Sequence, residues 1–283
     1  MPEGPEMFRV ARRVEKAVVG QALNEVWFAF PHLQKQAGRL QSLKVARVHT
    51  LGKALLIRFD GGPVIYTHNQ LYGRWMFSRP DARPDTTRQL RLALSTAKKS
   101  ALLYSASDIE LIEPEIMEDH PFIRRAGLDI LSSGADPEAV AEWISRPQFA
   151  RRRLGHLLLD QSFLAGVGNY LRSEILYLAA VHPAERPIDL GPERRLKLAE
   201  AAHALMWRSV ETGGITNDPD RVAGLKAAGW RRGDYRHYVF GRAGQSSFDA
   251  DAPIVREQVA GRRLYRCPVR QPAPGEGSAQ GSG

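Results

Sequence analysis

Strand-like and helix-like patterns occupy different parts of this chain of 283 residues. From about residue 22 to residue 107, short apolar runs with the period of strands are broken by turn signals, which is typical of a β-sandwich or barrel. From about residue 136 to residue 211, apolar residues recur every three to four positions, as in amphipathic helices. The chain is long enough for two cores, because a typical domain has roughly 100–200 residues. We therefore expect an α+β fold, with an N-terminal β-sandwich followed by a helical domain.

Loop-forming residues indicate the limits of the helical part. Residues 132–137, Ser-Ser-Gly-Ala-Asp-Pro, predict a linker followed by a capped helix start. We therefore assign residues 1–131 to the first domain and residues 132–228 to the helical domain. Helices are expected at residues 136–144, 154–159, 168–180 and 192–211, with residues 212–228 as a glycine-containing connection.

The last part of the chain alternates like a β-hairpin. Residues 229–271 contain short apolar runs that predict strands, at residues 238–240, 254–259 and 264–265. Residues 272–283 consist mostly of Pro, Gly, Ser, Ala and Gln, and are expected to be disordered.

The charge of the chain points to a polyanionic partner. There are 40 Lys and Arg residues against 31 Asp and Glu residues, which gives a formal net charge of +9. Between Arg221 and Gln271 there are eleven basic and four acidic residues, a local balance of +7. A solvated basic face without a partner would have the same composition, so charge alone does not decide between the two.

Cysteine content and hydropathy restrict the remaining classes. Cys267 is the only cysteine, so an intrachain disulfide and a cysteine-rich metal site are both excluded. No run approaches the ~18 consecutive apolar residues of a membrane span, and acids stand where a signal peptide has a basic region. We expect a cytoplasmic protein without a membrane partner.

The first residues combine a possible nucleophile with two acids. If Met1 is removed, which a small second residue permits, Pro2 becomes a free secondary amine beside Glu3 and Glu6. Such an amine can attack an aldehyde-level sugar carbon and form an iminium cation, which promotes elimination at neighbouring C–O bonds. A structural interpretation is also open, because Pro and Glu suit the first turn of the helix that the apolar spacing from Met7 to Val18 predicts.

Three loops carry further candidate residues. Lys53 follows Gly52 in a strand-to-strand connection and is either a phosphate ligand or an ordinary exposed lysine. Residues 69–73, Asn-Gln-Leu-Tyr-Gly, display an apolar and an aromatic side chain at a turn, which is costly unless they enter something. Asn169 follows Gly-Val-Gly at a helix start and is either a cap or part of a phosphate site.

Taken together, these segments resemble the formamidopyrimidine-DNA glycosylase and endonuclease VIII family of bifunctional DNA repair enzymes. The resemblance extends from Pro2 to Gln271, with five motifs in the same order. They are Pro-Glu-Gly-Pro-Glu at residues 2–6, Thr-Leu-Gly-Lys at 50–53, Tyr-Ser-Ala-Ser-Asp at 104–108, the run from Leu159 to Glu174, and Val-Ala-Gly-Arg at 259–262. Each motif alone is weak, but five in register are specific.

The resemblance implies a DNA glycosylase and AP lyase of base excision repair that acts on damaged double-stranded DNA without a cofactor, as a monomer in a bacterial cytoplasm with the nucleoid. Pro2 would attack C1′ of a nucleotide flipped out of the duplex, because the sugar carbon is shielded in the stack. Glu3 would be the general acid, assisted by Glu6. The catalytic residues implied are Pro2, Glu3, Glu6 and Lys53; the DNA-binding residues implied are Gln70, Leu71, Tyr72, Asn169, Arg172 and Arg262.

The wedge that fills the emptied duplex divides the family by substrate. The endonuclease VIII branch carries its wedge as contiguous residues, which resemble Gln70-Leu71-Tyr72, and prefers oxidised pyrimidines. The same chemistry on oxidised purines, or a catalytically silent protein that binds damaged DNA, are the alternatives. The intact acids beside Pro2 favour the enzyme, since a binding protein would not need them.

The C-terminal hairpin departs from the family pattern. Most bacterial members close a helix-two-turn-helix domain with a β-hairpin finger that holds zinc on four cysteines. In this sequence the corresponding positions are Ser247, Ala250, Cys267 and Arg270, so three ligands are missing. We therefore expect a zincless finger at residues 229–271, with no metal, with Cys267 as a buried thiol and with Arg262 still facing DNA.

Overall fold

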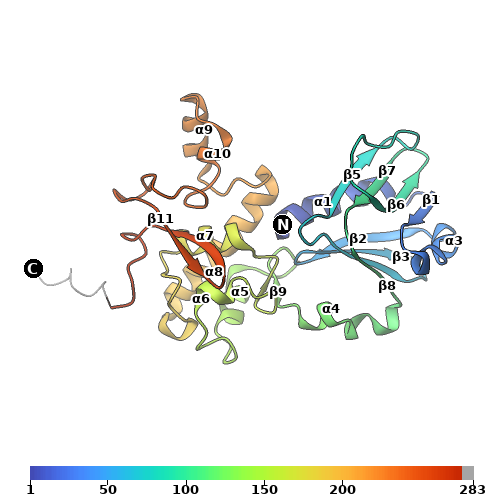
Figure 1. The fold of residues 1–283 in the computed structure, drawn as a ribbon. Coiled ribbons are helices and arrows are strands. Elements are labelled where there is room, and N and C mark those ends of the chain that lie inside the picture. Colours follow the sequence, from blue (N-terminus) through green and yellow to red (C-terminus); the bar gives the residue numbers. More distant parts are fainter. Residues whose placement is uncertain (276–283) are drawn as a thin grey trace, which may run out of the picture. The chain divides into compact units, whose positions relative to one another are not determined.

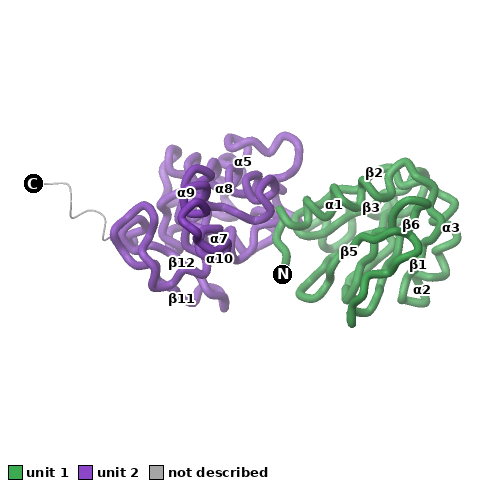
Figure 2. Tube along the Cα trace, turned by 90° about the horizontal axis from the view of Figure 1, so that it is seen from above, with its two compact units in different colours: residues 1–125 green, residues 126–283 purple. Residues whose placement is uncertain are grey.

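The computed structural model describes residues 1–275, and the chain divides into two compact units. The first unit comprises residues 1–125 and the second begins at Ala126 (Figure 2). Of the tail that was expected to be disordered, residues 276–283 lie outside the described residues. The α+β fold class is confirmed, because sheets dominate the first unit and helices the second.

The first unit is the β-sandwich that the alternating pattern predicted. One antiparallel sheet has the strand order β2-β3-β4-β8 and the other has the order β1-β6-β7-β5 (Figure 1). The strands are β1 (Leu23–Phe28), β2 (Val45–Leu51), β3 (Ala54–Phe59), β4 (Val64–His68), β5 (Arg74–Ser78), β6 (Leu90–Thr96), β7 (Ser100–Tyr104) and β8 (Asp108–Ile112).

Helix α1 (Gly4–Val18) packs on this sandwich through its apolar stripe. Met7, Val14 and Val18 are fully buried and share one core with Leu55 of β3 and Leu103 of β7. Burying each such side chain contributes about 1.5–3 kcal/mol to stability. The packing therefore fixes the first turn of α1, and with it residues 2–6, on the sandwich.

Some elements of the first unit were not predicted. Strand β8 lies beyond residue 107, where the strand region was expected to end, and it pairs with β4 along five residues. The short helices were also missed, because four to six residues are too few to establish a helical period. They are α2 (Pro31–Gln34), α3 (Ala37–Gln41), the 3₁₀ helix η1 (Pro114–Asp119) and α4 (Pro121–Arg125).

The second unit contains the predicted helices and a short strand pair. The expected boundary between residues 131 and 132 falls inside this unit, because β9 (Leu128–Asp129) pairs with β10 (Leu164–Ala165). Of the helices in residues 1–275, none combines the length and apolar character that a bilayer span needs. The elements that match the prediction are α5 (Pro137–Ile144), α6 (Leu154–Leu157), α7 (Asn169–Leu178) and α8 (Pro192–Thr212); the 3₁₀ helix η2 (Pro187–Asp189) is additional.

The prediction of a connection at residues 212–228 was wrong. Helix α9 (Pro219–Ala227) occupies most of it, and α10 (Arg232–Tyr235) follows. Asp218 caps α9 by accepting the backbone N–H groups of residues 220 and 221. Because only Val222 of α9 is buried, its apolar period is weak and the sequence pattern did not reveal it.

The C-terminal hairpin forms, with two strands in place of three predicted runs. Strands β11 (Val255–Val259) and β12 (Arg262–Arg266) pair antiparallel, as expected. Residues 238–240 are not a strand, because their backbone N–H groups donate to the carboxylate of Glu174 in place of a neighbouring strand.

Candidate functional site

The N-terminal acids lie together at the start of α1. The backbone N–H of Glu3 donates to the Glu6 carboxylate at 2.9 Å, and the carbonyl of Glu3 accepts from Met7 at 3.1 Å. Glu3 is 5% exposed, whereas Met1 is 52% exposed. A carboxyl that is largely removed from water therefore lies one residue from Pro2, and Glu6 has a structural task in holding that residue in place.

Lys53 lies in the tight turn between β2 and β3. Gly52, with a φ of 56°, and Lys53 are the only residues between Leu51 and Ala54, which pair across the hairpin. A left-handed backbone of this kind is readily adopted by glycine, which explains the residue before the lysine. Burial lowers the pKa of His68, with a further contribution from the nearby Lys53 charge. The Lys53 charge therefore lies near His68, the last residue of β4.

The hairpin that carries Lys53 should be sensitive to acid. Burial, reinforced by Arg58 and Arg47, lowers the pKa of His49 in β2 to about 4. His49 therefore stays neutral in the fold while it protonates in the unfolded chain, so stability is lost as the pH falls from the unfolded value near 6.5. Allowing for partial exposure, we expect a loss of about 1 kcal/mol between pH 7 and pH 5.

Hydrogen exchange of the β2 and β3 amides at the two pH values, corrected for intrinsic rates, measures this loss. His49→Gln cannot titrate and should show a smaller difference between pH 7 and pH 5 than the wild type. Equal differences in both proteins would contradict the assignment to His49.

The candidate wedge is the turn between β4 and β5. Leu71 is 59% exposed and Tyr72 is 71% exposed, as the sequence predicted for this turn. Exposure of two adjacent large apolar side chains is unfavourable without a partner. Leu71 and Tyr72 therefore form an exposed apolar surface that is available to a binding partner.

The backbone of this turn is held in one conformation. Gly73 N–H donates to the Asn69 carbonyl at 2.7 Å, and a Cβ at Gly73 would lie 2.5 Å from that oxygen. Gln70 has a left-handed φ of 50°, and its N–H donates to His68 Nδ1 at 3.1 Å. Arg88 Nη1 donates to the Tyr72 carbonyl at 2.7 Å. Sequence reasoning missed Arg88, since a contact across 16 positions leaves no local signal.

Asn169 is the first residue of α7 and is joined to the hairpin. Its side-chain amide donates to the Arg263 carbonyl at 2.9 Å, and its Oδ1 accepts from Arg172 Nη2 at 2.9 Å. Arg172 is fully buried and also donates to the carbonyls of Gly155 at 2.8 Å and Val259 at 3.0 Å. A buried guanidinium offers no surface to DNA, so Arg172 acts on this site by fastening Asn169 to the hairpin.

The tip of the hairpin exposes Arg262. The two turn residues, Ala260 and Gly261, have φ values of 54° and 69°, as in the tight turns that match the twist of paired strands. Arg262 follows at the start of β12, opposite Val259, with its side chain exposed. Within the second unit, the buried Arg172 thus links the residue at the start of α7 with the strands that carry Arg262.

The four finger positions do not fit a thiolate metal site. Ala250 has no donor atom, and Arg270 is a cation that donates to backbone carbonyls. Among residues 1–275, no group of three or more His, Cys, Asp or Glu side chains lies close enough to hold a metal ion. Cys267 is fully buried, which confirms the prediction of a buried thiol at this position.

Comparisons with known proteins identify the family of this chain. The profile of the formamidopyrimidine-DNA glycosylase N-terminal domain matches residues 1–107, and that of its H2TH domain matches residues 127–220. The chain is 40% identical to "Endonuclease 8" of Pectobacterium carotovorum over 268 residues, 95% of this chain and 98% of that one. It is 41% identical to "Endonuclease 8" of Shigella flexneri with the same coverage.

Solved structures have the same fold at lower sequence identity. Lactococcus lactis formamido-pyrimidine DNA glycosylase, bound to DNA that contains an AP site, superimposes with a TM-score of 0.76 at 20% identity, covering 95% of this chain and 99% of that one. MutM in complex with DNA that contains carbocyclic 8-oxo-G gives a TM-score of 0.75 at 21% identity, covering 96% and 100%. The two domain profiles and the curated relatives together show that this chain belongs to the formamidopyrimidine-DNA glycosylase family of DNA glycosylases and AP lyases.

Proposed function

We propose that this DNA glycosylase and AP lyase of base excision repair removes oxidised pyrimidines through a Schiff base at Pro2. The observation that carries the proposal is the first turn of α1, where the buried Glu3 adjoins Pro2 and is held by Glu6. Imine catalysis requires a nucleophilic amine with an acid beside it, and this turn contains both groups.

The reaction assigned to this turn has two stages. After Met1 is removed, the Pro2 nitrogen forms a bond to C1′, Glu3 supplies the proton for sugar ring opening, and the damaged base leaves. The resulting iminium cation withdraws electrons, so that a proton is lost from the sugar and the adjacent C–O bond to phosphate breaks. Hydrolysis of the imine then releases Pro2.

Binding of the flipped nucleotide requires cationic and amide groups at its flanking phosphates. We assign this task to Lys53, Asn169 and Arg262, each of which lies at a tight turn or a helix start. Helix N-termini favour phosphate, and an exposed Arg at a hairpin tip can approach the DNA backbone. Arg172 would act behind this site, through its contacts with Asn169 and the hairpin.

The preference for pyrimidines is supported by the wedge and by the relatives. Gln70, Leu71 and Tyr72 are contiguous in one preformed turn. The curated relatives named "Endonuclease 8" are 40–41% identical, whereas the solved structures named for formamidopyrimidine glycosylase are 20–21% identical. Since those relatives are bacterial, we also propose that this enzyme acts in the cytoplasm on the DNA of the nucleoid.

Borohydride trapping tests the proposed function. The protein, with a free Pro2 verified by mass spectrometry, is incubated with duplexes that contain an oxidised pyrimidine, 8-oxoguanine or an abasic site. We expect a reduced covalent complex with the oxidised pyrimidine and with the abasic site, and weaker trapping with 8-oxoguanine. No trapping by protein that begins at Pro2 would exclude the mechanism, and preferential trapping on 8-oxoguanine would move the substrate to oxidised purines.

The wedge should matter only where a stack has to be filled. We expect Leu71→Ala combined with Tyr72→Ala to slow base excision from duplex DNA about tenfold, because the unstacking that accompanies flipping costs a few kcal/mol. Excision from a single strand with the same lesion should change little, since no gap is left in a stack. Single-turnover rates on both substrates measure the effect.

Arg88→Gln should also slow base excision from duplex DNA more than from a single strand. The loss should be smaller than in the wedge variant, because the substitution frees the Tyr72 carbonyl without removing the wedge. Arg83→Gln is the matched control, since Arg83 precedes Arg88 in the β5–β6 connection but pairs with Glu25. Equal losses on duplex and single strand in the wedge variant would argue against a wedge.

A further inference from the structure

Two loops of the finger contain the four positions that correspond, by the family resemblance, to zinc-binding cysteines. The first finger loop comprises residues 242–250, which include Ser247 and Ala250, and the second comprises residues 267–271, which include Cys267 and Arg270. These side chains do not fit a metal. Ser247 and Arg270, one from each loop, contact the same residue, Tyr177 of α7.

Tyr177 binds the first finger loop through its hydroxyl. It is fully buried, and its hydroxyl lies 2.8 Å from Ser247 Oγ and 2.9 Å from Asp249 Oδ2. Burial raises the pKa of Tyr177 to about 12, so the phenol keeps its proton and donates it to Asp249. Ser247 must then be the donor in its own bond with Tyr177, because a phenol has one proton. The second oxygen of Asp249 accepts from Arg221.

The second finger loop binds the end of the same helix. Arg270 Nε donates to the Tyr177 carbonyl at 2.9 Å and Nη2 donates to the Leu178 carbonyl at 3.1 Å. These are the last two carbonyls of α7, where a cation also complements the helix dipole. Gln271, which is fully buried, completes the attachment by donating to the Val181 carbonyl at 2.9 Å and accepting from the Cys267 N–H at 3.1 Å.

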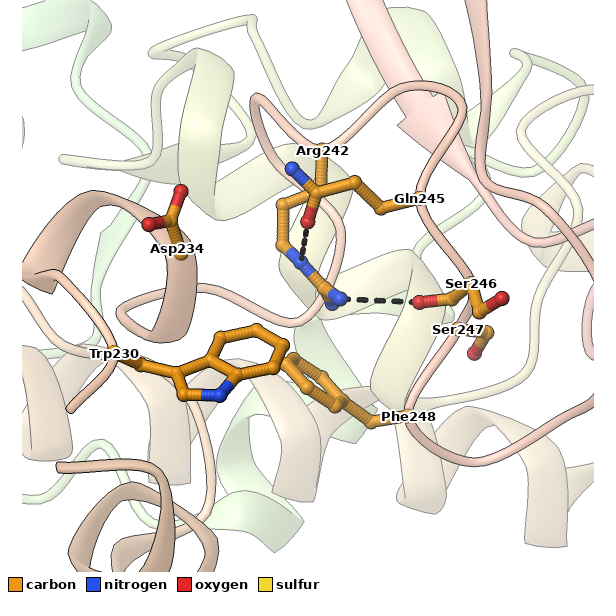
Figure 3. A pocket seen from close by; sticks show the side chains of 7 residues that line it. All are labelled: Trp230, Asp234, Arg242, Gln245, Ser246, Ser247 and Phe248. Carbon is orange, nitrogen blue, oxygen red and sulfur yellow. Dashed lines mark hydrogen bonds between the residues drawn. The ribbon is translucent and has the colours of Figure 1, made fainter. Parts of the chain in front are cut away.

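A second arginine fixes the shape of the first finger loop (Figure 3). The buried Arg242 donates to the Ser246 carbonyl and to Gln245 Oε1, each at 3.0 Å. Its guanidinium carbon lies 3.6 Å from the centre of the Phe248 ring. Because these contacts flank Ser247 on both sides, they hold the Ser247 hydroxyl toward Tyr177.

We propose that Tyr177, with Ser247, Asp249 and Arg270, ties both finger loops to α7 and takes the place of the structural metal. This Tyr177 cluster lies at the C-terminal end of a helix whose first residue is Asn169. A helix of ten residues spans only about 15 Å, so one rigid element carries the phosphate ligand at one end and the finger at the other. Tyr177 is therefore a positioning residue for Arg262; this last step rests on the proposed function, whereas the cluster does not.

The variant Tyr177→Phe tests the cluster, since it keeps the ring and removes the hydroxyl. We expect the amides of both finger loops to exchange about tenfold faster, because the bonds of a buried hydroxyl are lost. Ser247→Ala removes one of these bonds from the other side and should loosen the first finger loop as well. Tyr170→Phe is the matched control, since that hydroxyl lies on the same helix but bonds Ser209 of α8. Unchanged exchange in Tyr177→Phe would overturn the proposal.

The positioning role is read from DNA binding. Arg262→Ala should lower the slope of log DNA affinity against log salt concentration by about 0.9. If Tyr177 acts through Arg262, Tyr177→Phe should lower this slope toward the value of Arg262→Ala. The double variant should bind no more weakly than Arg262→Ala alone. Additive losses would refute action through Arg262 even if the finger loops exchange faster. Failure of borohydride trapping in the wild type would count against the proposed function and leave the exchange result standing.

An engineered zinc site tests independently whether the Tyr177 cluster takes the place of a structural metal. Ser247→Cys, Ala250→Cys and Arg270→Cys, made together beside Cys267 in the Tyr177→Phe chain, restore four thiolates. This variant should bind one zinc and regain slow exchange in both finger loops, and a chelator should reverse the gain. Failure to bind zinc, or zinc binding without slower exchange, would show that the cluster does not stand where the metal does.

Discussion

Glu3→Gln should separate the two activities of this enzyme. We expect base excision from an oxidised pyrimidine to fall by about 10²–10⁴-fold, the usual contribution of a positioned general acid. Strand cleavage at a preformed abasic site should be retained within about tenfold, because the base has already left and Pro2 can still form the iminium. Single-turnover assays on the two substrates give both rates from the same preparation.

The structure makes Gln a suitable replacement for Glu3. The Glu3 backbone donates to the Glu6 carboxylate and accepts from Met7, and the Glu3 side chain closes a capping box by accepting from the backbone N–H of Glu6. Gln keeps an acceptor oxygen at this position, so the first turn of α1 should be retained. Thermal unfolding of the variant should therefore match that of the wild type. Glu6→Gln is the comparison, since it weakens the acceptor that holds Glu3 without removing the acid, and its effect on excision should be smaller.

An equal loss of both activities in a folded Glu3→Gln protein would contradict this division of roles. Pro2→Gly adds a second check, because a primary amine can still form an imine. Some trapping should survive in that variant, whereas acetylation of its amine should abolish trapping altogether.

The architecture of the first unit was predictable because its signals are local. Helix α1 follows from the apolar spacing of Met7, Val14 and Val18, and the strand-like region expected at about residues 22–107 contains every strand of the sandwich except β8. Exposure of Leu71 and Tyr72 followed from their place in a turn. Helix α9 was missed because it buries one residue only, and a solvated helix of nine residues has no apolar stripe to detect.

The site residues were predictable as types, but their partners were not. Asn169 and Arg172 lie in one motif, yet only the fold shows that Arg172 is buried against the hairpin, 87 positions from Val259. Glu174 was part of the same motif, and nothing in its neighbourhood indicated that it would bind the backbone of residues 238–240. Such contacts depend on the packing of α7 against later segments, which leaves no periodic trace in the sequence.

The phosphate ligands should differ in how their loss responds to salt. Lys53→Ala and Arg262→Ala each remove a cation, so each should lower the slope of log affinity against log salt concentration by about 0.9. Asn169→Ala removes a neutral donor, so it should weaken binding with a smaller change in slope than either cation variant shows. We expect affinity for abasic duplex to fall about tenfold to a hundredfold in each variant, through loss of a charge-assisted contact.

Lys197→Ala is the charge-matched control, because Lys197 forms an exposed pair with Glu193 on α8. Its slope should equal that of the wild type if the effect belongs to bound phosphates and not to net charge. Asn169→Ala also removes a partner of Arg172, so the amides of the β11–β12 hairpin should exchange faster in that variant. Lys53 lies in the other unit, so the same amides should exchange at the wild-type rate in Lys53→Ala. A slope that falls equally in Lys53→Ala, Arg262→Ala and Lys197→Ala would mean that affinity follows total charge, and the assignment of individual phosphate ligands would then be wrong.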